Sequence, residues 1–177
     1  MGFTSRPVHA VISNHILNSL RIATAASASL LLTSAAYAAC AGTLYLTFDT
    51  GHMEPASAIA DILAKHQIKA TFFLANEKTK SGGWTLDDEQ KPFWQRLARE
   101  GHAFGSHTWN HHYFRGDVGV NQVRLIPWGQ GADKGRTLDA AGVCEEIKKP
   151  DTRFREMTGR NFDPIWRAPG GKTSPRY

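Results

Sequence analysis

Thr43-Leu44-Tyr45-Leu46-Thr47-Phe48-Asp49-Thr50-Gly51 joins a short β-branched and aromatic run to an abrupt polar end. The run predicts a strand over residues 43–48, because such side chains favour an extended, pleated backbone. Ala70-Thr71-Phe72-Phe73-Leu74 and His102-Ala103-Phe104-Gly105-Ser106 have the same character and predict two more strands. Pro164-Ile165-Trp166, which leads into Arg167, predicts a fourth strand.

Helical periodicity separates these runs. Residues 55–66 and 87–100 place apolar side chains at helical spacing, and a third helix is expected over 138–149, interrupted at Pro150 with further turns beyond it. Residues 115–136 are rich in glycine and predict a loop. Strands that alternate with helices in one short domain predict an α/β fold with a parallel sheet.

Composition limits the class of protein. The chain has 177 residues, 41% hydrophobic and 21% charged, which suits one globular domain and excludes a disordered tail. The net charge of +5 is spread along the chain without a block of Lys and Arg or a basic-aromatic stripe. We therefore expect no nucleic-acid partner.

The first 39 residues have the features of a secretory signal peptide. They contain two arginines and no acidic residue, followed by an apolar run of small residues, Ile22 to Ala39, that includes Ala36-Tyr37-Ala38. We expect residues 1–39 to be removed on export to the periplasm or the extracellular space, leaving a domain over 40–177 with no stable membrane span. Two alternatives remain open: an uncleaved membrane anchor, and a lipoprotein acylated at Cys40.

The two cysteines, Cys40 and Cys144, lie within the expected exported domain. Export would place them in an oxidising compartment, which favours a disulfide between them. The alternative is two unpaired thiols. With no third cysteine and no CxxC pair, a zinc site built from cysteines is excluded.

Polar side chains follow the predicted strands. Asp49 ends the first strand, His107 and His111 follow the third, and Arg167 follows the fourth. Chemistry in α/β folds gathers at the carboxyl ends of strands, so we expect these residues to lie together. On a helical turn the two imidazoles would face the same way and hold one metal ion with open positions for water, an arrangement suited to hydrolysis. The alternative for the pair is a chance surface arrangement.

Three segments resemble known motifs. Thr47-Phe48-Asp49-Thr50-Gly51, His107-Thr108-Trp109-Asn110-His111 and Arg167-Ala168-Pro169-Gly170-Gly171 resemble the first three motifs of the polysaccharide deacetylases, the NodB-homology domains of carbohydrate esterase family four. The resemblance implies a distorted (β/α) barrel and a divalent metal, usually zinc. It implies hydrolytic removal of N-acetyl or O-acetyl groups from a polysaccharide such as peptidoglycan or a chitin-like glycan.

The same resemblance implies a role for each matching residue. Asp49 would be the catalytic base, Arg167 would position it, and His107 and His111 would be metal ligands. Pro169 and Gly170 would contact the substrate. Apart from the resemblance, Trp128 in the glycine-rich loop is a candidate to stack on a sugar ring. Two more family motifs, one with the general-acid histidine, usually follow the third. The sequence ends at Tyr177, so we expect the N-terminal portion of an incomplete barrel.

Two positions depart from the family pattern. Thr50 stands where the family has an Asp that ligates the metal, and a neutral hydroxyl is a poor ligand for a divalent ion. His52 is a candidate substitute ligand beside Thr50, or Asp49 itself would bind the metal. Gly170 stands where an aromatic side chain usually lines the groove. These departures keep a second hypothesis open: a catalytically impaired relative that binds glycan, or a truncated fragment of such an enzyme.

Overall fold

The computed structural model describes residues 42–127, 134–175 and 177, and the helices and strands of these ranges lie in the unit Leu44–Tyr177. The expected signal peptide, Cys40 and Trp128 lie outside the described residues. No helix in the described ranges is long and apolar enough to cross a bilayer.

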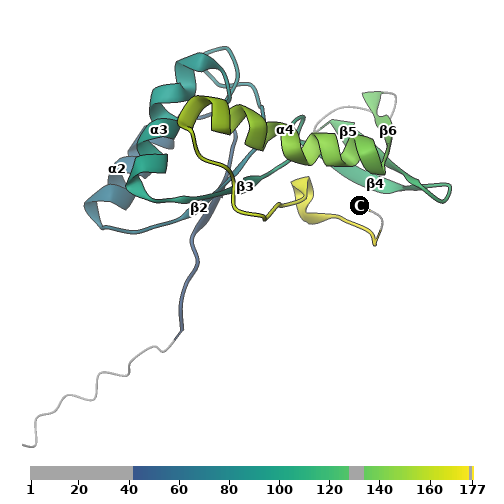
Figure 1. Ribbon diagram of the computed structural model, residues 1–177, viewed down its shortest axis with the longest axis horizontal. Helices are drawn as coiled ribbons and strands as arrows, with labels where there is room; N and C mark the ends of the chain where they lie inside the picture. The colour runs from purple at the N-terminus through teal and green to yellow at the C-terminus, as the bar shows by residue number, and fades with distance from the viewer. Residues whose placement is uncertain (1–41, 128–133, 176) are drawn as a thin grey trace, which may run out of the picture. The chain divides into compact units, whose positions relative to one another are not determined.

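The first half of the unit forms a three-stranded parallel sheet (Figure 1). Its strands are β1 (Thr47–Asp49), β2 (Thr71–Leu74) and β3 (Ala103–Ser106), in that order. Three of the four predicted strands are therefore confirmed, although the first is shorter than expected. Leu44 and Tyr45 are 90% and 83% exposed, and without burial the run before Thr47 has nothing to hold it in the sheet.

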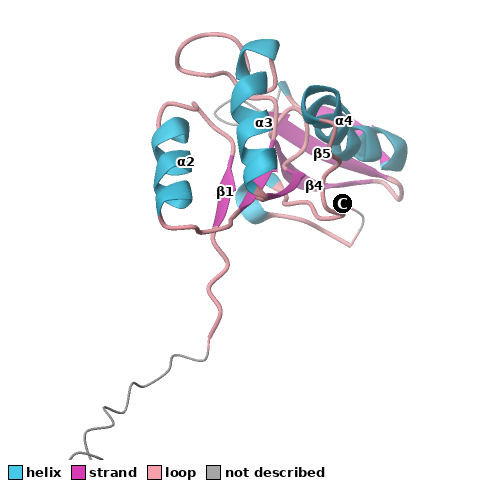
Figure 2. Cartoon of the chain, turned by 60° about the vertical axis from the view of Figure 1, so that its left-hand side comes forward, coloured by secondary structure: helices cyan, strands magenta, loops and turns pink. Residues whose placement is uncertain are grey.

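Two helices cover this sheet: α2 (Ala56–Lys65) and α3 (Lys91–Glu100), the latter preceded by the short 3-10 helix η1 (Asp88–Gln90) (Figure 2). Both fulfil the periodicity of the sequence. Their apolar faces and the strands form one core, which also takes in the end of the last helix. Its fully or nearly buried members include Leu63, Phe72, Leu74, Trp94, Leu97, Phe104, Phe154 and Met157.

The predicted fourth strand is not a strand of its own. Trp166 forms one isolated parallel bridge with Ser106. The amide of Ser106 donates to the carbonyl of Ile165 at 3.1 Å, and the amide of Arg167 donates to the carbonyl of Ser106 at 2.8 Å. This short pairing is enough to bring Arg167 to the edge of β3.

Most of the described part of the predicted loop over residues 115–136 belongs to a second sheet, so that prediction is wrong. β4 (His112–Val118), β5 (Gln122–Pro127) and β6 (Arg136–Asp139) pair antiparallel in the order β4-β5-β6. The alternation of apolar Val123 and Leu125 around a charged residue supplies the buried face, which packs on Val143. Glycines at the turns hid this period-two pattern.

The last helix, α4 (Ala140–Thr158), runs through Pro150 without a break, so the predicted interruption is wrong. Proline has no N–H to bond the carbonyl of Glu146 four residues earlier. That carbonyl accepts a hydrogen bond from the amide of Trp109 at 2.7 Å instead. Because the freed acceptor has a partner outside the helix, the helix tolerates the proline.

Candidate functional site

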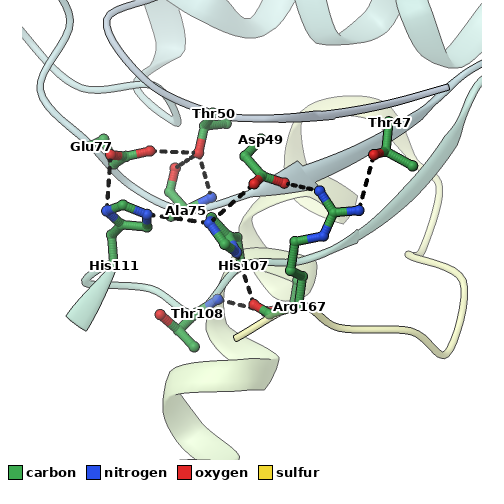
Figure 3. A network of polar contacts seen from close by, with 10 residues as sticks. Thr47, Asp49, Thr50, Ala75, Glu77, His107, Thr108, His111 and Arg167 are labelled. Carbon is green, nitrogen blue, oxygen red and sulfur yellow. Dashed lines mark hydrogen bonds and ion pairs between the residues drawn. The ribbon is translucent and has the colours of Figure 1, made fainter. Parts of the chain in front are cut away.

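The carboxyl ends of the parallel strands place five functional side chains together (Figure 3). Asp49 ends β1, Glu77 follows β2, His107 and His111 follow β3, and Arg167 follows the bridge at Trp166. Four of these residues are the ones that the sequence analysis selected. Their convergence confirms the expected clustering at one edge of the sheet.

Arg167 fixes the carboxylate of Asp49. Its Nη1 donates to Asp49 Oδ1 at 2.7 Å, and its Nη2 donates to Thr47 Oγ1 at 3.0 Å. The guanidinium lies over the ring of Phe73, 4.1 Å from the ring centroid. A planar guanidinium held at three points orients the carboxylate. The second oxygen, Oδ2, is left toward His107, 3.7 Å from its Nε2.

His107 is almost fully buried, with 3% of its side chain exposed. Its Nδ1 lies 2.8 Å from the backbone carbonyl of Arg167. A carbonyl only accepts, so Nδ1 carries the proton and Nε2 is bare in the neutral ring. Burial lowers the pKa of His107, an effect that Asp49 partly opposes, which favours this neutral form.

His111 repeats this arrangement with a different partner. Its Nδ1 lies 3.2 Å from Glu77 Oε1, and its Nε2 lies 3.2 Å from Nε2 of His107. Burial lowers the pKa of His111, partly opposed by the charge of Glu77. Nδ1 of His107 donates to a carbonyl and Nδ1 of His111 faces a carboxylate oxygen, so the two Nε2 atoms are turned toward each other. Two lone pairs at this distance repel unless a cation or a proton lies between them.

This geometry suits two ligands of one metal ion. Two nitrogens bound to a tetrahedral Zn²⁺ at about 2.0–2.1 Å are about 3.3 Å apart, close to the 3.2 Å observed. In the part of the chain that the structure describes, no group of three or more His, Cys, Asp or Glu side chains is placed to hold a metal. The histidine pair alone supplies two nitrogen donors at a separation that fits a divalent ion. The remaining coordination positions of such an ion would be open to oxygen ligands.

The segment between the two histidines is not the helical turn that the spacing predicted. Thr108 and His111 have φ angles of 63° and 51°, so two left-handed residues bend the chain and turn both rings inward. For the β-branched Thr108 this conformation costs about 1–3 kcal/mol and needs support from its surroundings. His112, which follows the pair directly, is buried at the start of β4.

Glu146 of α4 supplies that support. Its carboxylate accepts from the Asn110 amide at 3.0 Å and from Asn110 Nδ2 at 2.6 Å. Arg136 Nη1 donates to the same carboxylate at 3.1 Å. Together with the backbone bond from Trp109 to the Glu146 carbonyl, these contacts tie the histidine segment to α4.

Within the described residues, neither candidate substitute ligand forms a hydrogen bond or an ion pair with the two Nε2 atoms. The Thr50 hydroxyl donates to Glu77 Oε2 at 2.9 Å and accepts from the Ala75 amide at 2.9 Å. His52 is exposed on the turn after β1. Among the described residues no hydrogen bond or ion pair joins His52 to either histidine of the pair.

The third motif forms a tight turn, the 3-10 segment η3 (Pro169–Gly171), against β4. Pro169 is buried and Gly170 is exposed with a φ of 68°. A Cβ at Gly170 would lie 2.3 Å from the ring of Tyr113. Tyr113 also packs edge-on against His111, 5.5 Å between centroids. An aromatic ring therefore stands beside the site, contributed by position 113 rather than 170.

The sequence analysis missed three residues of this neighbourhood: Glu77, Tyr113 and Glu146. Glu77 had a signal, since it follows a predicted strand at the same edge as the motif residues. Tyr113 and Glu146 had none, because they reach the site through the second sheet and α4. Cys144 is exposed and unpaired in the described ranges, and the disulfide with Cys40 stays a prediction.

Comparison with known proteins places the chain in a family. A family model described as "Polysaccharide deacetylase" matches residues 37–177. The chain belongs to the polysaccharide deacetylase family. A chitin deacetylase from Pestalotiopsis sp is 30% identical over 118 residues, 67% of this chain and 31% of that protein. A peptidoglycan-N-acetylglucosamine deacetylase from Bacillus cereus is 41% identical over 67 residues, 37% of this chain and 22% of that protein.

The fold agrees with this membership. The solved chitin deacetylase from Colletotrichum lindemuthianum superposes with a TM-score of 0.53 at 21% identity, covering 75% of this chain and 47% of that one. The chain is mixed α/β with an open sheet, as expected of an incomplete (β/α) barrel of the polysaccharide deacetylase type. It spans less than half of the length of these three relatives.

Proposed function

We propose that the chain carries the metal-binding and base-bearing part of a hydrolase that removes acetyl groups from an N-acetylated, or O-acetylated, polysaccharide. The observation that carries the proposal is the pair of Nε2 atoms that face each other at 3.2 Å beside the Asp49 carboxylate, which Arg167 holds. Relatives named as deacetylases of chitin and of peptidoglycan support these two glycans as the substrate class. The spread of positive charge along the chain supports a glycan rather than a nucleic acid as partner.

The divalent ion in this proposal is zinc, held by His107 and His111. Imidazole nitrogens at this separation suit zinc, and a bound ion of this kind polarises a carbonyl and lowers the pKa of water. The chain's own groups do the rest. Arg167 engages Oδ1 of Asp49, while Oδ2 faces the histidine pair and is placed to take a proton from an attacking water.

We also propose that the protein acts outside the cytoplasm. The support is the sequence of residues 1–39 alone, with its two arginines, its apolar run and its small-residue end. Fusion of residues 1–45 to a reporter enzyme that is active only after export tests this proposal. Export with cleavage near residue 39 is the expected result, and retention of the reporter in the cytoplasm would contradict it.

Acetate release tests the activity. The protein, supplied with zinc, is incubated with chitin oligosaccharides and, separately, with peptidoglycan, beside an Asp49→Asn variant. We expect acetate from at least one substrate and a loss of at least about 100-fold in the variant, the size of a general-base contribution. A second candidate, a glycan-binding protein without turnover, is favoured by the neutral Thr50. It predicts retention on the glycan with no acetate release from either protein.

A further inference from the structure

Glu77 is a carboxylate at the carboxyl end of the parallel sheet, beside His107 and His111. None of the three motifs assigns it a role. It lies on the loop after β2, and its side chain is only 20% exposed. A carboxylate with so little contact with water needs polar partners within the protein. The partners are specific: Oε1 faces Nδ1 of His111 at 3.2 Å, and Oε2 accepts from the hydroxyl of Thr50 at 2.9 Å.

The backbone of Glu77 is fixed as firmly as its carboxylate. Its amide donates to Thr85 Oγ1 at 3.0 Å, and its carbonyl accepts from the Thr85 amide at 2.9 Å. Thr85 itself is completely buried. A carboxylate held at both ends in this way is suited to orienting a neighbour, and the neighbour it contacts is His111.

Thr50 and Glu77 are chemically matched. The residue at position 50 presents a donor where residue 77 presents an acceptor, and the Thr50 hydroxyl is itself held by the Ala75 amide. An aspartate at position 50 would bring a second negative group against Oε2 of Glu77, which is unfavourable without a cation. The neutral residue at 50 and the carboxylate at 77 are therefore consistent with one another.

We propose that Glu77 is a positioning residue of the metal site and supplies the negative charge that position 50 lacks. It accepts from Nδ1–H of His111, which fixes the tautomer with Nε2 bare and aims that nitrogen at His107. A carboxylate behind a ligating histidine has this effect in metal sites, and its loss costs about 10–100-fold in metal affinity. The inference rests on the metal site of the proposed function.

Two measurements test it. The first is the tautomer of His111 in the metal-free chain, read from its ring-nitrogen NMR shifts. The proposal predicts the proton on Nδ1 in the wild type and a mixture of tautomers in Glu77→Gln. The second is zinc affinity by calorimetry for the wild type, Glu77→Gln and the exposed control Glu89→Gln, which removes the same charge. We expect about 10–100-fold weaker binding in Glu77→Gln and none of this loss in Glu89→Gln.

A double substitution tests whether the negative charge can be moved from position 77 to position 50. Thr50→Asp with Glu77→Thr moves the carboxylate back to position 50, and we expect it to bind zinc more tightly than Glu77→Gln. If Glu77→Gln binds zinc like Glu89→Gln with an unchanged tautomer, the inference is overturned while the metal site stands. A wild-type chain that binds no zinc overturns the proposed function. A proton found on Nε2 of His111 in the metal-free wild type overturns the role of Glu77 without any variant.

Discussion

Replacement of Glu146 by alanine tests the support that α4 gives to the histidine segment. The substitution removes both carboxylate contacts to Asn110, at 3.0 and 2.6 Å, and the contact to Arg136. Hydrogen bonds to a charged group contribute about 1.5–3 kcal/mol each, reduced here because Asn110 and Arg136 reach solvent. We expect the free energy of unfolding to fall by about 3 kcal/mol.

Urea denaturation of the metal-free chain measures this loss, and calorimetry measures zinc affinity in parallel. Glu145→Ala is the matched control, since Glu145 is exposed on the same helix and should change stability by less than about 0.5 kcal/mol. Once the segment is released from α4, the strained backbone at Thr108 relaxes and the two imidazoles separate, so zinc affinity should fall as well. Equal stability and equal zinc affinity in the two variants would refute the anchoring role of Glu146.

Three further predictions concern other contacts. In Arg167→Lys the ammonium group cannot engage Asp49 and Thr47 together, so acetate release should fall about 100-fold, while the free energy of unfolding stays within about 1 kcal/mol of the wild type. Unchanged acetate release would contradict the role of the two guanidinium contacts in holding Asp49. Gly170→Ala should destabilise the chain more than Gly171→Ala in urea, because both have left-handed φ angles but only a Cβ at 170 meets the Tyr113 ring; equal losses would exclude the clash. The metal-free chain should be less stable near about pH 5.5 than near about pH 7.5. Burial lowers the pKa of His102, His107, His111 and His112, so the unfolded state binds more protons than the folded state as the pH falls below their usual 6.5, while the raised pKa of Glu77 opposes this with a single proton. A flat or inverted pH profile of stability would contradict these directions for the four histidines.

The parallel sheet was predictable because its strands are continuous apolar runs with polar ends. Phe72 and Phe104 are register partners on the neighbouring strands β2 and β3, and the burial of both rings follows from the apolar composition of the two runs. The same local logic brought Asp49, His107, His111 and Arg167 to one edge. The carboxyl ends of parallel strands lie at one edge of the sheet, so the order of strands along the sequence is enough to predict that side chains at these ends lie close together.

The rest depended on contacts between distant segments. Pro150 predicts a helix break unless the carbonyl of Glu146 has another partner, and that partner, the Trp109 amide, lies 37 residues away in sequence. The left-handed Thr108 is likewise tolerated only because the histidine segment is tied to α4. Local propensity favours neither conformation, so a reading of neighbouring residues predicts a helical turn where the chain bends.

Zinc titration of the metal-free chain, beside a variant with His107→Ala and His111→Ala, tests the central claim most directly. The facing Nε2 atoms at 3.2 Å predict one zinc ion bound per chain in the wild type, confirmed by elemental analysis, and none in the variant. Circular dichroism establishes that both proteins are folded. A folded wild-type chain that binds no zinc, or a variant that binds as much as the wild type, would contradict the assignment of this pair as the metal site.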